Sequence, residues 1–209
     1  MPTKTATTAK ASTPSPAKTT AQIKITLRHT KPVIWRRVLV PHDIKLPKLN
    51  HVIQATMGGW EGSHLHSFFD GEDYYQPIFK DFLFGGDEDE NSKDETKYRL
   101  SDLLPKEGGH LLYTYDFGDD WEHDIVLEKL TPADKRLTRA QVIAGENAGP
   151  PEDCGGVPGY YQLVKALNNP KHPEHENLRD WLGLEEGEKF DPAAFDLAAA
   201  NADLARIKV

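Results

Sequence analysis

Cysteine is almost absent from this chain, because Cys154 is the single one among 209 residues. A disulfide framework is therefore excluded, and a lone thiol is typical of a reducing compartment, so we expect a cytoplasmic protein. Long apolar runs are missing too, since no stretch reaches the roughly 18 apolar residues of a membrane helix. The first 20 residues also lack the apolar centre of a secretory signal. We therefore expect no membrane association.

Positive charge is scarce outside the N-terminus. The formal net charge is −8, and the first 20 residues carry Lys4, Lys10 and Lys18 but no acid, which leaves −11 for the rest. Nucleic acid is bound through a positive surface, so such an acidic domain is disfavoured as a general nucleic-acid binder. Residues 1–20 are predicted to form a disordered basic tail, because their composition gives little apolar surface to bury.

Residues 21–209 carry the patterns of a single α+β domain. Residues 22–27 alternate polar and apolar side chains, and residues 33–40 are rich in β-branched ones, which together predict a strand hairpin. Residues 47–57 place apolar side chains at helical spacing, begin with a proline and end before two glycines. This segment is therefore predicted to be an amphipathic helix.

Further strands follow the helix. Residues 64–68 read as a strand and 100–104 as a short helical turn, while 111–117 and 122–127 form the clearest hairpin of the chain. Residues 85–95 hold six acids and are predicted to be an exposed loop. This order of elements is typical of the β-grasp (ubiquitin-like) fold, in which one helix packs on a mixed sheet.

The β-grasp-like core is predicted to span residues 21–130, and residues 131–209 to form a loop and helical extension. A Gly/Pro-rich loop covers residues 145–159. Three short helices are then predicted as a C-terminal cap: one from Tyr160 to Leu167, one from Pro173 that buries Leu178, Trp181 and Leu182, and one opening at Asp191-Pro192.

Four segments carry a family resemblance. They are KITLRHTKPVIWRRVLVP, HVIQATMGGWEGSHLH, YDFGDDWEHDIVLEK and PPEDCGGVPGY. Together, and in this order, they resemble the plasmid pRiA4b ORF-3-like family over about residues 21–200. The resemblance implies an uncharacterised protein, and some members of the family travel with plasmids or other mobile genetic elements. Some of those members carry a resolvase-like name, but nothing in this chain resembles a recombinase active site.

The chain departs from the family pattern at one position. Relatives often carry a second cysteine just before the Pro-Pro-Glu-Asp-Cys-Gly-Gly segment, where this chain has Gly149. Cys154 therefore stands alone, and a metal or redox function that needs both thiols is not expected here.

Histidines and acids offer a candidate metal site. His64 and His66 are two residues apart on a predicted strand and would project to the same side, with Asp116 and His123 near a hairpin. Imidazole and carboxylate donors suit zinc or another divalent ion, which would make the chain a metal-dependent hydrolase. The alternative is structural, because Asp and Gly also favour tight turns. No cofactor is firmly implied.

The aromatic and basic residues Trp35, Arg36 and Arg37 form the strongest positive spot in the acidic domain. A cation beside an aromatic ring is one device for stacking bases or holding phosphate, so a mobile-element accessory protein that contacts nucleic acid is a further alternative. The structural alternative, which we favour, is a buried Trp35 with both arginines paired to the acids of the Asp116–Asp124 hairpin.

The leading hypothesis is a binding domain with an unknown protein partner, because the sequence has no complete catalytic triad, phosphate loop or metal signature. The residues do not decide between this and an enzyme. The candidate surface comprises Trp35, Arg36, Arg37, His64, His66, Asp116, Asp119, Asp120, Trp121, His123, Glu152, Asp153 and Cys154.

Overall fold

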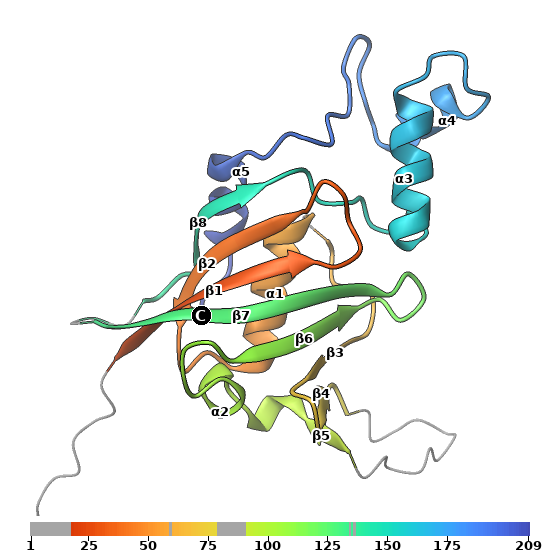
Figure 1. Cartoon of the computed structure of the whole chain (residues 1–209). Helices are drawn as coiled ribbons and strands as arrows, with labels where there is room; N and C mark the ends of the chain where they lie inside the picture. Colours follow the sequence, from red (N-terminus) through yellow and green to blue (C-terminus); the bar gives the residue numbers. More distant parts are fainter. Residues whose placement is uncertain (1–17, 59, 79–90, 134, 136) are drawn as a thin grey trace, which may run out of the picture.

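A computed structural model describes residues 18–58, 60–78, 91–133, 135 and 137–209 of the chain (Figure 1). Its centre is an eight-stranded sheet with the strand order β5-β4-β3-β6-β7-β1-β2-β8. The strands are β1 (Thr19–Leu27), β2 (Trp35–Pro41), β3 (His66–Phe69), β4 (Tyr74–Gln76), β5 (Ser92–Asp94), β6 (His110–Tyr115), β7 (Trp121–Pro132) and β8 (Gln141–Glu146). The helices are α1 (Leu46–Met57), η1 (Glu95–Lys97), α2 (Leu100–Leu103), α3 (Gly156–Leu167), α4 (His175–Trp181) and α5 (Leu197–Leu204).

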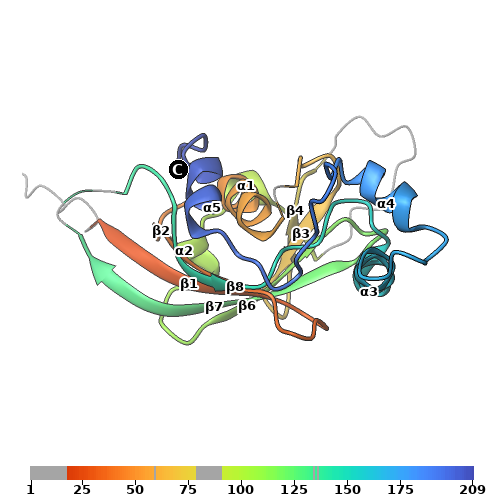
Figure 2. The ribbon, with the colours of Figure 1, turned by 90° about the horizontal axis from the view of Figure 1, so that it is seen from above.

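The core lies between the sheet and α1. Every second residue of β1 is buried, from Ala21 to Leu27, because successive side chains of a strand point to opposite faces. Helix α1 buries Leu49, Val52 and Ile53 along one stripe, as its apolar spacing predicts. Helices α1 and α5 lie on the same face of the sheet, whereas α3 and α4 lie at one end of the molecule (Figure 2).

The α+β class and the helix packed on a mixed sheet are confirmed, but the β-grasp fold is not. The sheet has eight strands, and β1 pairs antiparallel with both β2 and β7. The one parallel pairing joins the short strands β4 and β5 at the sheet edge. The hairpin of β6 and β7 and the hairpin of β1 and β2 are both present, as predicted.

Several boundaries differ from the prediction. Strand β5 lies inside the predicted acidic loop 85–95, of which residues 85–90 lie outside the described residues. Helix α5 is capped by the side chain of Asp196, which accepts hydrogen bonds from two backbone amides, and not by Asp191. Trp181 is 49% exposed, so its predicted burial is wrong. None of the helices in the described ranges is long and apolar enough to cross a bilayer.

Candidate functional site

The candidate site lies at the end of β6. Asp116 follows the last residue of that strand with a φ of 56°, a left-handed conformation that Asp adopts more readily than most residues. Its amide donates to the Leu65 carbonyl at 2.8 Å, and its Oδ1 accepts from the Gly118 amide at 2.9 Å. These bonds leave Oδ2 facing the His64 ring, 3.6 Å from Nδ1.

The Pro150–Gly156 loop is held over the same end of the sheet. Trp60 donates its indole N–H to the Pro150 carbonyl at 2.9 Å. The Glu152 carboxylate accepts from the Glu61 amide at 2.9 Å and from the Tyr115 hydroxyl. These bonds fix the loop against the strand end.

Three carboxylates therefore surround His64. Besides the Asp116 contact, His64 Nε2 lies 3.0 Å from Asp153 Oδ1 and 4.0 Å from Glu152 Oε1. The structure thus brings together residues from the segment just before β3, the β6–β7 turn and the Pro150–Gly156 loop. The turn is tied to the loop independently, because Asp119 Oδ2 accepts from the Gly155 amide at 3.0 Å.

The other two predicted metal ligands lie elsewhere. Strand β3 begins at His66, so His64 precedes the strand and the two rings do not share a side through strand alternation. His66 Nε2 is paired with Glu95 Oε2 at 2.8 Å in a buried contact. Among the described residues, the four-residue set of His64, His66, Asp116 and His123 is not assembled around one point.

His123 is sealed in an aromatic cluster under the site. Its ring is fully buried, 5.6 Å from the Trp60 ring and 5.4 Å from the Tyr113 ring. Neither ring nitrogen has a hydrogen-bond partner among the residues that the structure describes. Burial lowers the pKa of His123 to about 4. Trp121, at 1% exposure, belongs to the same cluster. Its place among the candidate surface residues is therefore wrong.

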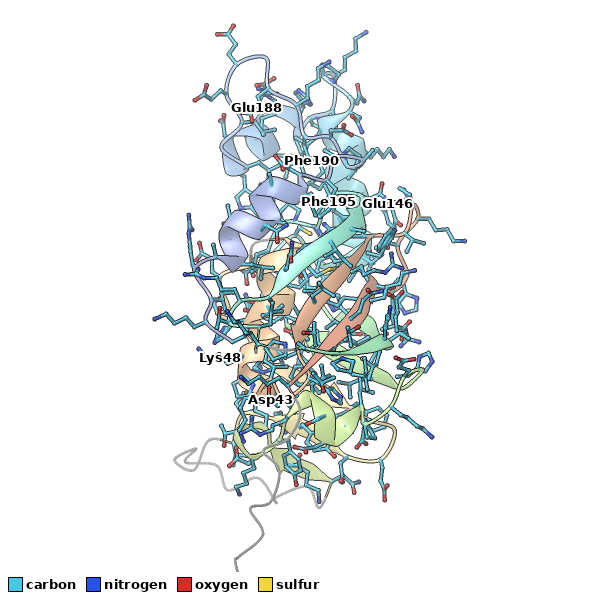
Figure 3. The ribbon with its side chains drawn as sticks, turned by 90° about the vertical axis from the view of Figure 1, so that its left-hand side faces the viewer. Asp43, Lys48, Glu146, Glu188, Phe190 and Phe195 are labelled. Atoms are coloured by element: carbon cyan, nitrogen blue, oxygen red, sulfur yellow. The ribbon has the colours of Figure 1, made fainter. Side chains whose placement is uncertain are left out.

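The predicted basic spot on β2 is only partly at the surface, where the Arg37 side chain is 30% exposed and lies 5.2 Å from the centre of the Trp35 ring. Arg36 is buried, and burial lowers its pKa to about 10, while Trp35 is the half-buried residue of the pair. The Arg36 guanidinium stacks on the Phe195 ring, which lies near Glu146 in Figure 3. Arg37 is paired with Glu128 at 2.6 Å. The structural alternative, which paired it with the acids of the Asp116–Asp124 hairpin, is therefore wrong for this residue. Asp120 stays exposed at the turn.

Cys154 is half-buried and lines the same pocket as Asp153. Burial, together with the charges of Asp119 and Asp153, raises the pKa of this thiol to about 12. A second cysteine has no room, because a Cβ at Gly149 would lie 1.3 Å from the Met57 carbonyl oxygen. The departure from the family pattern therefore has a packing reason in this chain.

A pocket of about 630 Å³ opens beside the cluster, between α3 and the α4 region. Its lining includes Asp153, Leu163, Lys165, Glu174, Leu178 and Trp181. Helical spacing had assigned Trp181 to a buried face, so sequence reasoning missed it as a site residue. Glu95 was missed as well, because only the fold brings it to His66.

The comparisons with known proteins agree with one another. The sequence pattern described as plasmid pRiA4b ORF-3-like protein matches residues 19–199. The chain is 34% identical over 184 residues to the uncharacterized protein y4hQ of Sinorhizobium fredii, covering 86% of this chain and 88% of that protein. It also resembles the crystal structure of the protein of unknown function MM3350 from Methanosarcina mazei Go1, with a TM-score of 0.71 and 33% identity. That match covers 87% of this chain and 97% of the other. On these grounds the chain belongs to the plasmid pRiA4b ORF-3-like family.

Proposed function

We propose that the chain is a non-catalytic binding domain that takes a lysine or arginine side chain of a protein partner into the pocket between α3 and α4. The observation that carries this proposal is Trp181, an indole that is 49% exposed in a pocket also lined by Asp153 and Glu174. A volume of about 630 Å³ lies within the range of roughly 300–1,000 Å³ that is usual for ligand sites.

The lining fits both parts of a basic side chain. An indole face attracts a cation through its quadrupole, and carboxylates add direct charge attraction. Leu163 and Leu178 provide apolar contact for the methylene stem of a lysine or arginine. Lys165 also lines the pocket and balances part of the carboxylate charge there.

The acids around the pocket supply the remaining attraction. Asp119, Asp120 and Glu152 lie at the same end of the molecule as Asp153, and the whole chain carries a net charge of −8. A negative surface of this kind attracts basic partners over a distance and raises their association rate.

The state of the buried groups supports binding over catalysis. A pKa of about 12 leaves the Cys154 thiol protonated at neutral pH, and only a thiolate is an effective nucleophile. The hydrolase expected from His64, His66, Asp116 and His123 loses its basis, because His66 is bound to Glu95 and His123 is buried without access to solvent.

A random peptide display library tests the proposal directly. The full chain is expected to enrich peptides in which lysine or arginine adjoins aliphatic residues. A synthetic peptide of the enriched sequence is then titrated by calorimetry. Trp181→Ala and Glu174→Gln should each weaken binding about tenfold, which corresponds to losing a partly desolvated cation contact.

Matched controls come from the same chain. Glu186→Gln removes an exposed acid outside the pocket lining, and Tyr74→Ala removes a 41% exposed aromatic on β4. Both should bind the peptide like the wild type. Enrichment of acidic or uncharged peptides, or wild-type affinity in Trp181→Ala, would contradict the proposal.

A further inference from the structure

We infer that His64, Asp116 and Asp153 form a binding site for one divalent transition-metal ion of the zinc class. The inference goes beyond the proposed peptide binding and does not depend on it. One ring nitrogen of His64 and one carboxylate oxygen from each aspartate lie within 4.8 Å of one another. No other such group of three His, Cys, Asp or Glu side chains occurs among the described residues.

The spacing suits closure around a small ion. Zinc binds nitrogen and oxygen at about 2.0–2.2 Å, so neighbouring ligands of a tetrahedral ion lie about 3.4 Å apart. His64 offers one ring nitrogen to an ion, and this nitrogen and the two carboxylate oxygens lie within 4.8 Å of one another, so small side-chain rotations would bring them to this spacing. The Asp153 side chain is 65% exposed, so it is free to rotate onto an ion.

His64 Nε2 has an unmet need for a partner. Solvent does not reach this atom, and it has no hydrogen-bond partner in the described part of the chain, although a carboxylate oxygen lies at 3.0 Å. The angle between the His64 ring and the Asp153 oxygen falls outside hydrogen-bond geometry, so the short distance is not a hydrogen bond. A buried polar atom left without a partner costs free energy, and a metal ion would satisfy the nitrogen lone pair.

The surroundings hold the ligands in place. Asp116 and Asp153 have φ values of 56° and 58°, and Asp116 is further fixed by the Gly118 amide on its other oxygen. Glu152 keeps both of its oxygens on Glu61 and Tyr115 and so anchors the loop that carries Asp153. Supporting bonds of this kind orient metal ligands.

The donor set selects the class of ion. One imidazole with two carboxylates favours zinc, manganese or iron(II) over calcium and magnesium, which prefer oxygen ligands alone. Three protein ligands leave one tetrahedral position open for water or a partner's side chain.

A different explanation is that His64 acts only as a charged partner of its three carboxylates. Metal titration separates the two explanations, because only a metal site binds one equivalent of Zn²⁺ and loses that binding when either aspartate is changed. The probe is Zn²⁺ alone, added by calorimetry to the full chain that has been treated with chelator, with Mg²⁺ as the comparison ion.

We expect one equivalent of Zn²⁺ to bind with a dissociation constant in the micromolar range or below, and Mg²⁺ to bind at least about tenfold more weakly. His64→Ala, Asp116→Asn and Asp153→Asn should each weaken Zn²⁺ binding by about tenfold or more. Asparagine tolerates the left-handed backbone at 116 and 153, so both of these variants keep the fold.

Two controls use the same residue types outside the cluster. His110→Ala and Asp124→Asn alter an exposed histidine and an exposed aspartate on β6 and β7, and both should bind Zn²⁺ like the wild type. Absence of stoichiometric binding would overturn the site, as would unchanged affinity in the folded Asp153→Asn variant. Failure of peptide binding would leave the metal result untouched, and the reverse also holds.

Discussion

Two neighbouring arginines on β2 show how burial decides the role of a side chain. Arg36 is 2% exposed, and its guanidinium donates to the carbonyls of Thr56, Trp35 and Glu146 at 2.7, 2.8 and 2.9 Å. Thr56 lies in the last turn of α1, where a positive charge is favoured by the helix dipole. Arg36 therefore joins β2, β8 and the end of α1.

Replacing Arg36 by lysine should lower the free energy of unfolding by about 2–3 kcal/mol, because an ammonium group cannot reach three carbonyls as the planar guanidinium does. The matched change Arg37→Lys should cost at most about 1 kcal/mol, since Arg37 pairs with Glu128 in partial contact with solvent. Urea unfolding followed by circular dichroism measures both. Equal losses would contradict the structural role given to Arg36.

His123 makes the stability of the fold depend on pH. Its pKa is lowered from 6.5 to about 4, so between these values the unfolded chain binds a proton that the folded chain does not. His123 therefore leaves the free energy of unfolding unchanged above pH 6.5 and lowers it progressively as the pH falls from 6.5 toward 4. The difference amounts to about 3 kcal/mol at the acidic end.

The variant His123→Phe tests this dependence, because phenylalanine keeps a ring beside Trp60 and Tyr113 without unpaired polar atoms. Urea unfolding at several pH values should show equal or higher stability at pH 7 and a loss toward pH 4 that is smaller by about 3 kcal/mol. His110→Phe, at an exposed position, should keep the wild-type pH profile. An unchanged profile in His123→Phe would show that His123 is not the titrating group.

At the scale of elements, the sequence predicts the strands and helices that have a periodic apolar face. It does not predict strands that form only through backbone pairing with a neighbour. Strands β1, β2, β6 and β7 and helix α1 were predicted because each has one apolar face. Strand β5 has the sequence Ser-Lys-Asp and is held through backbone pairing with β4, so no side-chain pattern marks it. Strand β8 has one well-buried side chain, Val142, and runs into the glycine-rich loop.

The candidate site was predictable in its parts but not in its combination. His64 and Asp116 were candidate metal ligands, and Asp153 was a surface candidate. Which of the histidines meets which acids depends on where β3 starts and on how the Pro150–Gly156 loop folds back. Both depend on tertiary structure. Local spacing predicted that His66 lies beside His64, whereas in the folded chain His66 is hydrogen-bonded to Glu95.

Helix α5 protects the open edge of β8 through one side chain. Asn201 accepts from the Val142 amide at 3.0 Å and donates to the Val142 carbonyl at 2.9 Å, which occupies backbone groups that an edge strand leaves unpaired. Asn201→Ala should lower the free energy of unfolding by about 1–2 kcal/mol and speed hydrogen exchange at the Val142 amide. Asn177→Ala, at an exposed position on α4, should do neither. Slow exchange at Val142 in Asn201→Ala would contradict the edge-protecting role.

On the scale of the whole molecule, acidic groups gather at the end where α3 and α4 lie. The pocket and the His64 cluster share Asp153, so both proposed sites open at this end of the sheet. A bound divalent ion would reduce the negative charge that a basic side chain meets there. The two sites are therefore expected to influence each other if both are occupied, with the metal weakening peptide binding.

The distribution of positive charge predicts how the chain meets DNA. Arg36 is buried and Arg37 is paired with Glu128, so neither arginine of β2 is an unpaired surface cation. The first 20 residues carry three lysines and no acid. Any retention of the full chain on a duplex DNA column at low salt should vanish when Lys4, Lys10 and Lys18 are all changed to Gln, because non-specific binding follows the number of phosphate contacts. Arg37→Ala should leave retention unchanged. A larger loss from Arg37→Ala than from the triple lysine variant would restore β2 as a nucleic-acid surface, and with it the accessory role at a mobile element.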